Sequence, residues 1–459
     1  MARDVTDATP IASRAQLVEW FEHGCKPAEA FRLGTEHEKF PFYTKDLSPV
    51  PYEGAAGRGG IGALLEGLAR TGAWQGIEDQ GALIGLHDPL AGGAVSLEPA
   101  GQFELSGAPL ETVHQTSAEL HGHIALAKEA ARPHGIGFLG LGMSPLWTKA
   151  QTPVMPKSRY RIMADYMPKV GSRGLDMMFR TCTVQVNLDF ASEADMVKKL
   201  RVSLALQPLV TALFANSPFT DGRPNGLLSA RSEIWRDTDN ARAGMLPFAF
   251  ESGMGFERYV DYALDVPMYF VMREGRYHDV AGASFRDLLD GRLPQLPGER
   301  ATLADWANHL STIFPEVRLK RWLEMRGADA GGADHMLALP AFFVGLLYDS
   351  DVLDAAWDLV KYAGAQDRQG ARDEAPRLGL QARMGARTLR ELGAEALALS
   401  RRGLQRRRRL NEAGEDETIY LEPLADRVER GRSPAQHWLD RYEGAWEKSL
   451  RPIFQEAAL

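Results

Sequence analysis

The chain has 459 residues, of which 44% are hydrophobic and 25% are charged, and its formal net charge is −8 at pH 7. This composition is that of an ordinary globular protein that can bury a large core. The negative charge argues against the overall basic footprint of a nucleic-acid-binding protein, and no stretch approaches the roughly 18 consecutive apolar residues of a membrane span. We therefore expect neither nucleic acid nor a membrane as a partner.

The first residues of the sequence carry acids and no apolar run, so they resemble neither a secretory signal nor a transit peptide. The two cysteines, Cys25 and Cys182, lie far apart and form no Cys-x-x-Cys pair. This spacing argues against a disulfide framework and against a structural zinc site. Together these features predict a reducing compartment, and we expect a cytoplasmic location.

In chain order, residues 13–30 are predicted to form a helix with Ser13 as its N-cap, and the alternating run 31–40 is predicted to be a strand. Further strands are predicted at 94–106, interrupted by a Pro-Ala-Gly bend, and at 181–190, 266–273 and 318–326. Helices are predicted at 60–70, 108–132 and 193–215, and over most of the chain from residue 340 onward. Strands separated by long, uneven insertions favour an α+β fold with an antiparallel sheet over a doubly wound parallel sheet.

Two glutamates of the first predicted strand lie two positions apart. Side chains alternate along a strand, so Glu36 and Glu38 share one face and can direct two carboxylates to one point. Two like charges this close require a compensating cation. The alternative is an ordinary solvent-facing strand of a half-buried sheet, which is the more frequent origin of a single Glu-x-Glu pattern.

The same pattern recurs in the other predicted strands. Glu98 and Glu104 flank the Pro-Ala-Gly bend. One face of the next strand holds Thr183, Gln185, Asn187 and Asp189. The last strand aligns Arg318, Lys320, Trp322, Glu324 and Arg326. In a shared sheet, these residues would place acids and amides at the centre of one face and arginines at its rim. Such a face suits phosphoryl transfer, because Mg²⁺ takes oxygen ligands and arginine neutralises the moving phosphoryl group.

Several other motifs carry less weight. Two Gly-x-Gly-x-x-Gly matches, at 57–62 and 135–140, do not lie between an apolar strand and a helix, and no P-loop is present. The basic block 401–409 is followed by the acidic stretch 412–417, which is typical of a solvated, self-compensating surface. The Gly-rich segment 251–256 is either part of a cover over a site or an ordinary turn.

Blocks spread over residues 12–455 resemble the plant and proteobacterial type of glutamate–cysteine ligase. They are 32–40 (RLGTEHEKF), 97–106 (LEPAGQFELS), 180–190 (RTCTVQVNLDF), 230–235 (ARSEIW), 256–268 (FERYVDYALDVPM), 322–326 (WLEMR) and 340–345 (PAFFVG). The resemblance implies a glutamine-synthetase-like fold, in which a curved antiparallel sheet with surrounding helices holds Mg²⁺ and the substrate ATP. It also implies one catalytic unit over 1–459, in which 12–340 carry the sheet and active site and 341–459 are mostly helical.

The resemblance assigns roles to particular residues. The metal-binding positions it implies are Glu36, Glu38, Glu98, Glu104 and Glu324. Arg326 matches a phosphate-stabilising arginine that contacts the nucleotide, and Arg231 matches a substrate- or phosphate-binding arginine with Arg236 as its neighbour. Gln185 stands where more distant bacterial ligases use a histidine metal ligand, and its neutral amide oxygen is a weaker ligand.

The activity implied by the resemblance is the first step of glutathione biosynthesis. ATP and Mg²⁺ would drive the joining of the glutamate γ-carboxyl to the cysteine amine through a γ-glutamyl phosphate, in a monomer or a homodimer. Plant members are controlled through disulfides, but two cysteines allow at most one bridge here. Two alternatives remain open at this point: a ligase with a different acceptor amine, and an inactive nucleotide or amino-acid sensor on the same scaffold.

Overall fold

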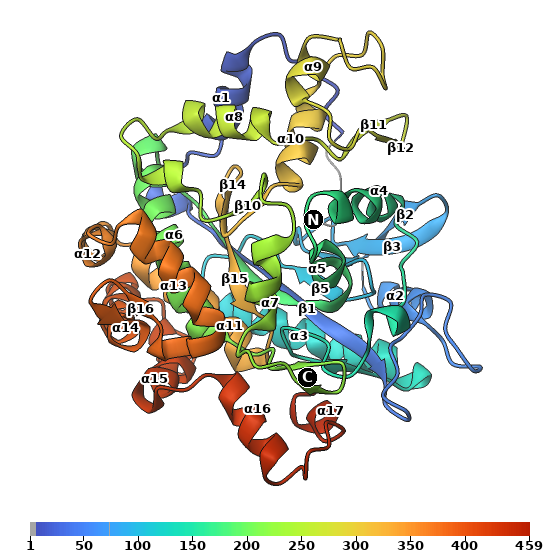
Figure 1. Cartoon of the computed structure of the whole chain (residues 1–459), viewed down its shortest axis with the longest axis vertical. Helices are drawn as coiled ribbons and strands as arrows, with labels where there is room; N and C mark the ends of the chain where they lie inside the picture. Colours follow the sequence, from blue (N-terminus) through green and yellow to red (C-terminus); the bar gives the residue numbers. More distant parts are fainter. Residues whose placement is uncertain (1–5, 73) are drawn as a thin grey trace.

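A computed structural model describes residues 6–72 and 74–459. Its centre is an open antiparallel sheet with the strand order β14-β15-β7-β1-β5-β4-β3-β2, in which β6 also pairs with β1 (Figure 1). The strands of this sheet are β1 Leu33–Tyr43, β2 Gln75–Asp79, β3 Ala82–His87, β4 Ala94–Leu97, β5 Phe103–Ser106, β6 Ile136–Leu139, β7 Thr183–Leu188, β14 Val317–Leu319 and β15 Leu323–Asp329. This architecture confirms the α+β class predicted from the sequence.

Helices surround the sheet. They are α1 Arg14–Glu22, α2 Ile61–Ala69, α3 Val113–Ala131, α4 Ser158–Tyr166, α5 Gly174–Arg180, α6 Glu193–Phe214, α7 Ala230–Ile234, α8 Phe256–Asp265, α9 Phe285–Leu289, α10 Leu303–Ser311, α11 Ala333–Leu347, α12 Ser350–Val360, α13 Ala365–Leu378, α14 Leu389–Arg407, α15 Glu422–Arg430, α16 Pro434–Glu443 and α17 Ile453–Glu456. The helices of the C-terminal third, orange to red in Figure 1, gather beside α6 and below it.

Short strands lie outside the central sheet. They form four two-stranded pairs: β8 Phe219–Thr220 with β9 Arg223–Pro224, β10 Ala243–Gly244 with β13 Phe314–Pro315, β11 Phe270–Arg273 with β12 Arg276–Asp279, and β16 Arg383–Met384 with β17 Arg387–Thr388. The pair β10 and β13 is parallel, and it fixes the segment that carries Phe314 next to the sheet.

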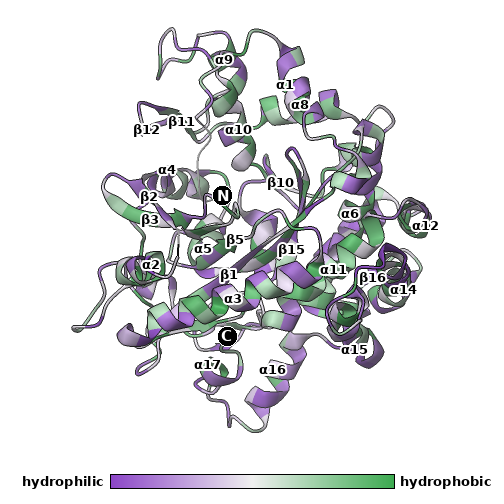
Figure 2. Cartoon of the chain, turned by 180° about the vertical axis from the view of Figure 1, so that it is seen from behind, coloured by the Kyte–Doolittle hydropathy of each residue, from purple (hydrophilic) through white to green (hydrophobic). Residues whose placement is uncertain are grey.

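The main core lies between one face of the sheet and the helices α6 and α11. Val184, Val186 and Leu188 of β7 are fully buried on this face. Almost every residue of α6 from Leu200 onward is buried, and α11 is buried from His335 to Leu347, as expected of helices that are covered on all sides. Figure 2 shows the hydrophobic colouring of α11 where it lies against the sheet. The opposite face of β7 is therefore left for polar side chains.

Three of the predicted helices, at 60–70, 108–132 and 193–215, correspond to α2, α3 and α6. The prediction of one helix over 13–30 is wrong, because α1 ends at Glu22 and the chain passes Pro27 before a short 3-10 turn. The strand predicted at 266–273 is confined to β11 and lies outside the central sheet. Val266 instead ends α8, and Pro267 cannot donate a backbone hydrogen bond to a ladder.

The strand predicted at 318–326 is a hairpin. The chain reverses between β14 and β15, where the Lys320 backbone N–H donates to the Trp322 carbonyl. Arg318 then pairs directly across from Glu324. The five alternating residues therefore do not line one strand, as the sequence alone suggested, and the reversal instead brings opposite charges together.

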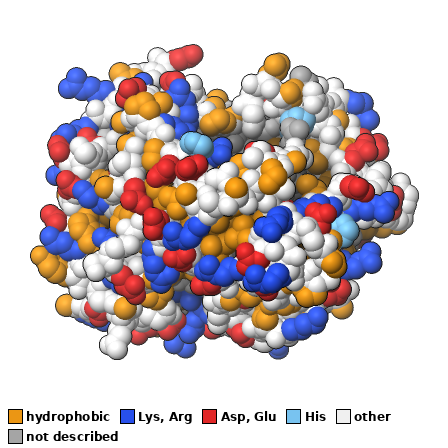
Figure 3. Space-filling view, turned by 90° about the horizontal axis from the view of Figure 1, so that it is seen from above, with side chains coloured by type: hydrophobic (Ala, Val, Ile, Leu, Met, Phe, Trp, Pro, Cys, Tyr) orange, Lys and Arg blue, Asp and Glu red, His pale blue; other side chains and the backbone are white. Residues whose placement is uncertain are grey.

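In the described part of the chain, no single helix is long and apolar enough to cross a membrane, although the bent pair α11 and α12 together reach that length and composition. Cys25 and Cys182 are both free thiols, the first partly and the second fully buried. On the face shown in Figure 3, acidic and basic side chains are interspersed.

Candidate active site

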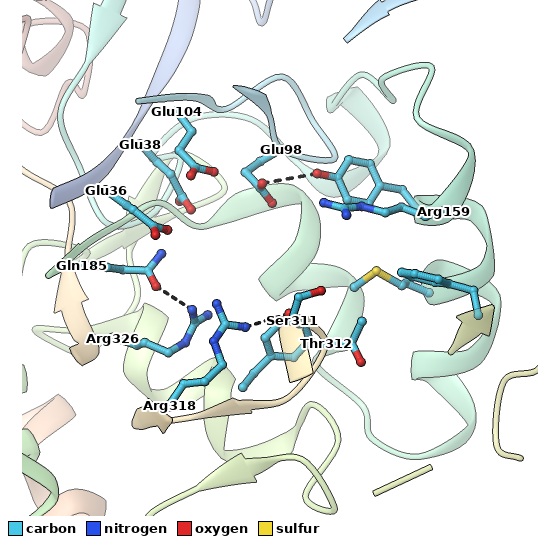
Figure 4. Close-up of a pocket in the computed structure, with 14 residues that line it drawn as sticks. Glu36, Glu38, Glu98, Glu104, Arg159, Gln185, Ser311, Thr312, Arg318 and Arg326 are labelled. Carbon is cyan, nitrogen blue, oxygen red and sulfur yellow. Dashed lines mark hydrogen bonds between the residues drawn. The ribbon is translucent and has the colours of Figure 1, made fainter. Parts of the chain in front are cut away.

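Four of the five glutamates predicted from the sequence line one cavity. Its volume is about 100 Å³, and its charged and amide lining consists of Glu36, Glu38, Glu98, Glu104, Gln185, Arg159, Arg318 and Arg326. Figure 4 shows the four carboxylates on one side of this cavity and Arg318 and Arg326 across from them. The structure therefore brings together residues that are spread over nearly 300 positions of the sequence, from Glu36 to Arg326.

Strand register explains why the carboxylates converge. Glu38 of β1 lies directly opposite Glu104 of β5, and Glu36 lies directly opposite Gln185 of β7. Directly opposed residues of antiparallel strands project from the same face of the sheet. Glu98 joins them from the turn between β4 and β5, where its backbone N–H donates to Gln102 O at 3.0 Å. Two neighbouring strands and one turn thus supply the four carboxylates, and β7 adds the amide of Gln185 beside them.

The surroundings of Glu38 disfavour its ionised form. Burial, together with the negative charges of Glu98 and Glu104, raises its pKa well above the usual range. The Arg231 guanidinium and a 2.9 Å hydrogen bond from the Thr183 backbone N–H to Glu38 Oε2 act in the opposite direction. Glu38, Glu98 and Glu104 thus repel one another in a buried setting, and these two contacts oppose that repulsion.

Neighbouring polar groups orient the other carboxylates. Asn187 Nδ2 donates to Glu36 Oε1 at 2.9 Å, and Ser106 Oγ donates to Glu104 Oε1 at 2.6 Å. The hydroxyl of Tyr160, on α4, lies 3.3 Å from Glu98 Oε1 and 2.8 Å from the Leu97 carbonyl oxygen. Such contacts restrict the rotamers of potential metal ligands and leave further oxygen lone pairs for the cavity.

The fifth predicted glutamate, Glu324, lies apart from this group. It is fully buried and forms ion pairs with Arg318 at 2.6 Å, with Lys320 at 2.8 Å and with Arg326. Burial alone would raise its pKa, but the charges of Arg318, Lys320 and Arg326 hold that pKa well below the usual range. As the structure stands, Glu324 organises the arginines on the basic side of the cavity and does not join the four carboxylates.

The two predicted arginines occupy different positions. Arg326 lines the cavity and donates from Nη1 to Gln185 Oε1 at 2.5 Å, so Gln185 faces a cation. Arg231, on α7, is only 3% exposed and donates from Nη2 to the Arg326 carbonyl at 2.9 Å. It lines an adjoining cavity of about 90 Å³ that shares Glu38 and Arg326 with the first. Arg236 lies outside both cavities and pairs with Glu233 at 2.8 Å.

The sequence did not single out several residues that line the main cavity. Arg159 and Tyr160 enter from α4, and Ser311 and Thr312 come from the end of α10. No motif surrounds Arg159 in the sequence, and only the packing of α4 over the sheet brings it to the site. Arg318 did carry a signal, because it stands in the same charged run as Glu324 and Arg326.

The donor set matches the preferences of Mg²⁺, since its oxygen atoms come from four carboxylates and one amide. Burial and the like charges of Glu98 and Glu104 raise the pKa of Glu38, and a bound divalent cation relieves both effects. Within the described residues, no three acidic, histidine or cysteine side chains already lie close enough to hold one ion together. Because Mg²⁺ commonly takes only one or two carboxylates and keeps several waters, the set nevertheless fits its chemistry.

Comparison with known proteins supplies an independent line of evidence. A model of the family described as "Glutamate-cysteine ligase family 2" matches residues 32–456. The chain belongs to this family. The resemblance seen in the sequence blocks is thereby confirmed, and family membership identifies the chain as an enzyme that catalyses a ligase reaction.

Relatives support the same assignment. The chain is 51% identical to the chloroplastic glutamate–cysteine ligase B of Oryza sativa subsp. japonica, over 99% of this chain and 88% of that protein. It is 52% identical to the chloroplastic glutamate–cysteine ligase of Nicotiana tabacum, over 98% of this chain and 84% of that one. A crystal structure of the glutamate–cysteine ligase of Francisella tularensis in complex with AMP shares the fold, with a TM-score of 0.54, 12% identity and coverage of 93% and 88% of the two chains.

These relatives contradict the predicted cytoplasmic location, because they are chloroplastic enzymes. The prediction rested on the composition of the first residues and on the scarcity of cysteine. Neither feature reports on the compartment, since a targeting segment is recognised separately from the folded enzyme.

Proposed function

We propose that this protein joins the γ-carboxyl of glutamate to the amine of cysteine in an ATP- and Mg²⁺-dependent reaction, the first step of glutathione biosynthesis. The observation that carries the proposal is the cavity in which four carboxylates face Arg318 and Arg326 (Figure 4). Family membership and the names of the relatives support the substrates. We also infer that residues 1–459 act as one catalytic unit, since α11 packs against both the sheet and the C-terminal helix α14.

The acidic side of the cavity would hold the metal. Glu36, Glu38, Glu98 and Glu104 are the residues that would bind Mg²⁺, and the bound ion would neutralise the ATP phosphates and polarise the γ-phosphoryl group. Asn187 and Ser106 would keep their carboxylates oriented throughout. Gln185 would act less as a ligand than as a partner of Arg326, because its amide oxygen already accepts a hydrogen bond from that arginine.

The basic side would stabilise the charge that moves during the reaction. In the proposed first step, the glutamate γ-carboxylate attacks the γ-phosphorus of ATP and forms an acyl phosphate, while ADP leaves. Arg318 and Arg326 face the carboxylates across the cavity, and Glu324 holds both guanidinium groups in fixed positions, so little reorganisation is needed as charge develops. Arg159 adds a third cation to the same cavity.

The second step requires a separate position for an amino-acid substrate. The cysteine amine attacks the acyl carbon and phosphate leaves, so no protein nucleophile is required. Arg231 lines the adjoining cavity together with Met177, Met178 and Trp235. The buried Arg231 guanidinium beside these apolar side chains suits the carboxylate of an amino acid, and binding there would exclude water from the acyl phosphate.

The test is to measure phosphate release from ATP with Mg²⁺ and glutamate, with and without cysteine, while the peptide product is followed by mass. We expect release that depends on cysteine and equals the γ-glutamylcysteine formed. Turnover only with another amine would retain the chemistry and change the acceptor. Binding of nucleotide or amino acid without any turnover would instead favour the sensor alternative.

A pair of variants tests the metal assignment. Glu36→Gln keeps the shape of the side chain but removes one charge from the cavity, so we expect kcat to fall by roughly 10²–10³-fold. The control is Glu78→Gln, at an exposed position of β2 in the same sheet, for which we expect wild-type turnover. Normal activity and normal Mg²⁺ dependence of the Glu36 variant would contradict the assignment.

A further inference from the structure

One buried carboxylate outside the cavity lies beneath the segment that carries Arg231. Asp329 is the last residue of β15 and is 1% exposed. Its Oδ2 accepts hydrogen bonds from the Asn216 backbone N–H at 2.8 Å and from Ser217 Oγ at 2.6 Å, and its Oδ1 accepts one from Ser229 Oγ at 2.8 Å. All three donors belong to the chain before α7.

Both serine hydroxyls connect Asp329 to the start of α7. Ser229 is the N-cap residue, and its Oγ accepts a hydrogen bond from the Ser232 backbone N–H at 3.1 Å. Ser217 Oγ accepts one from the Arg231 backbone N–H at 3.2 Å. A hydroxyl has one proton, and each of these protons is donated to Asp329, so the lone pairs are directed at the two backbone N–H groups. The backbone N–H groups of Arg231 and Ser232, which have no partner within the first turn of the helix, thus gain hydrogen-bond acceptors.

These contacts act on the short helix that carries Arg231. Helix α7 has five residues, which is too short for its own hydrogen bonds to define its orientation. The carboxylate is held by its three hydrogen bonds and packs closely against Gly142, where a Cβ would lie 2.4 Å from Asp329 Cγ. The fixed carboxylate therefore orients the hydroxyls of Ser217 and Ser229. These hydroxyls in turn hold the backbone from which Arg231 reaches the adjoining cavity.

We propose that Asp329 is a positioning residue for Arg231, acting through Ser217 and Ser229 on the first turn of α7. The inference rests on the proposed function, in which Arg231 binds the carboxylate of an amino-acid substrate. It assigns to Asp329 a role in amino-acid affinity, and none in the binding of ATP or of the metal.

The test compares Asp329→Asn with Asp189→Asn. Asp189 is a suitable control because it is 5% exposed and accepts a hydrogen bond from the Arg32 backbone N–H at 2.7 Å, but none of its contacts leads to α7. We expect Asp329→Asn to raise the KM of glutamate or of cysteine about tenfold, with the KM of ATP unchanged. The control should leave all three values near those of the wild type. An equal rise for all three substrates in Asp329→Asn would overturn the proposal.

A double-mutant cycle separates positioning from general destabilisation. If Asp329 acts through Arg231, Asp329→Asn should have no further effect on kcat/KM in an Arg231→Ala background. Effects that multiply in the double variant would contradict the proposal. Ser217→Ala and Ser229→Ala should each reproduce part of the change in KM, since each removes one of the two connections.

A measurement that does not depend on activity keeps this inference distinct from the proposed function. Amide hydrogen exchange of a peptide containing residues 230–234 should become at least about tenfold faster in Asp329→Asn and remain unchanged in Asp189→Asn. Unchanged exchange in both variants would refute the positioning role. If the wild-type protein made no γ-glutamylcysteine, the proposed function would fail, while the exchange experiment would still decide how Asp329 acts.

Discussion

Replacing Glu324 by Gln tests whether this carboxylate supports the arginines of the site or is only a metal ligand. In the structure its two oxygens pair with Arg318, Lys320 and Arg326, and the carboxylate is completely buried. The glutamine side chain keeps the shape of glutamate but removes its negative charge. It also directs an amide N–H toward one of the three cations. Arg318 and Lys320, which are 4% and 3% exposed, would then have lost their common counter-charge.

The expected cost follows from this burial. Removing one member of a buried ion pair typically destabilises a protein by about 3–5 kcal/mol, since the remaining charge stays buried without compensation. With an unfolding entropy of roughly 2 cal/mol/K per residue, each kcal/mol lowers the midpoint of a chain of 459 residues by about 1 °C. We therefore expect the unfolding midpoint of Glu324→Gln to fall by about 3–5 °C.

The assay is thermal unfolding in buffer that contains EDTA, so that no bound metal contributes. The control is Glu299→Gln, because Glu299 pairs with Arg273 at 2.8 Å but its side chain is 50% exposed. A pair exposed to this degree contributes less than about 1 kcal/mol, and the midpoint should fall by less than about 1 °C. A carboxylate that only awaited a metal would gain stability when neutralised in EDTA, so an unchanged or higher midpoint for Glu324→Gln would refute the reasoning.

Three further predictions follow from other parts of the structure. Burial lowers the pKa of His309 to about 4, below the value of about 6.5 expected in the unfolded chain. Between these two pH values the unfolded state binds more protons than the folded state. The free energy of unfolding therefore falls as the pH decreases from about 6.5 to about 4. This histidine accounts for about 3 kcal/mol of that loss. His309→Gln should therefore flatten the plot of denaturant midpoint against pH. A slope identical to that of the wild type would contradict the role of His309. Gly403→Ala would place a Cβ 1.8 Å from the Gly345 carbonyl oxygen, where α14 crosses α11, and should lower the free energy of unfolding by about 2 kcal/mol or more. The control Gly370→Ala has open space at its Cβ and should raise the free energy of unfolding by about 0.5–1 kcal/mol. Similar denaturant midpoints for the two variants would contradict the close approach of the helices. Ser106→Ala removes the hydroxyl that orients Glu104 and should raise the Mg²⁺ concentration for half-maximal turnover about tenfold, a shift that titration of activity with Mg²⁺ would detect or exclude.

Local periodicity was sufficient to predict much of the acidic side of the site. Because side chains alternate along a strand, the placement of Glu36 and Glu38 on one face required no knowledge of the rest of the fold, and both line the cavity. The bend between Glu98 and Glu104 was likewise evident from its Pro-Ala-Gly sequence. The long helices α3 and α6 also followed from local pattern, with boundaries that differ by a few residues from those predicted.

The basic side could not be predicted in the same way. Alternation along 318–326 indicated one strand, but a reversal at 320–322 pairs Arg318 with Glu324 and turns a row of charges into a buried cluster. Whether a carboxylate binds a metal or an arginine depends on which cations reach it, and that is decided by chain reversal and packing.

The sequence by itself determined the family, the α+β class and the chemical character of the strands, because these depend on residue types and on spacing within single elements. Only the tertiary structure decided that Glu38 faces Glu104, that Glu324 lies among cations and that Arg159 reaches the cavity from α4. Each of these relations joins segments far apart in the chain. Strand register and helix packing determine their geometry. Because both are relations between elements, they produce no residue pattern within the sequence of any one segment.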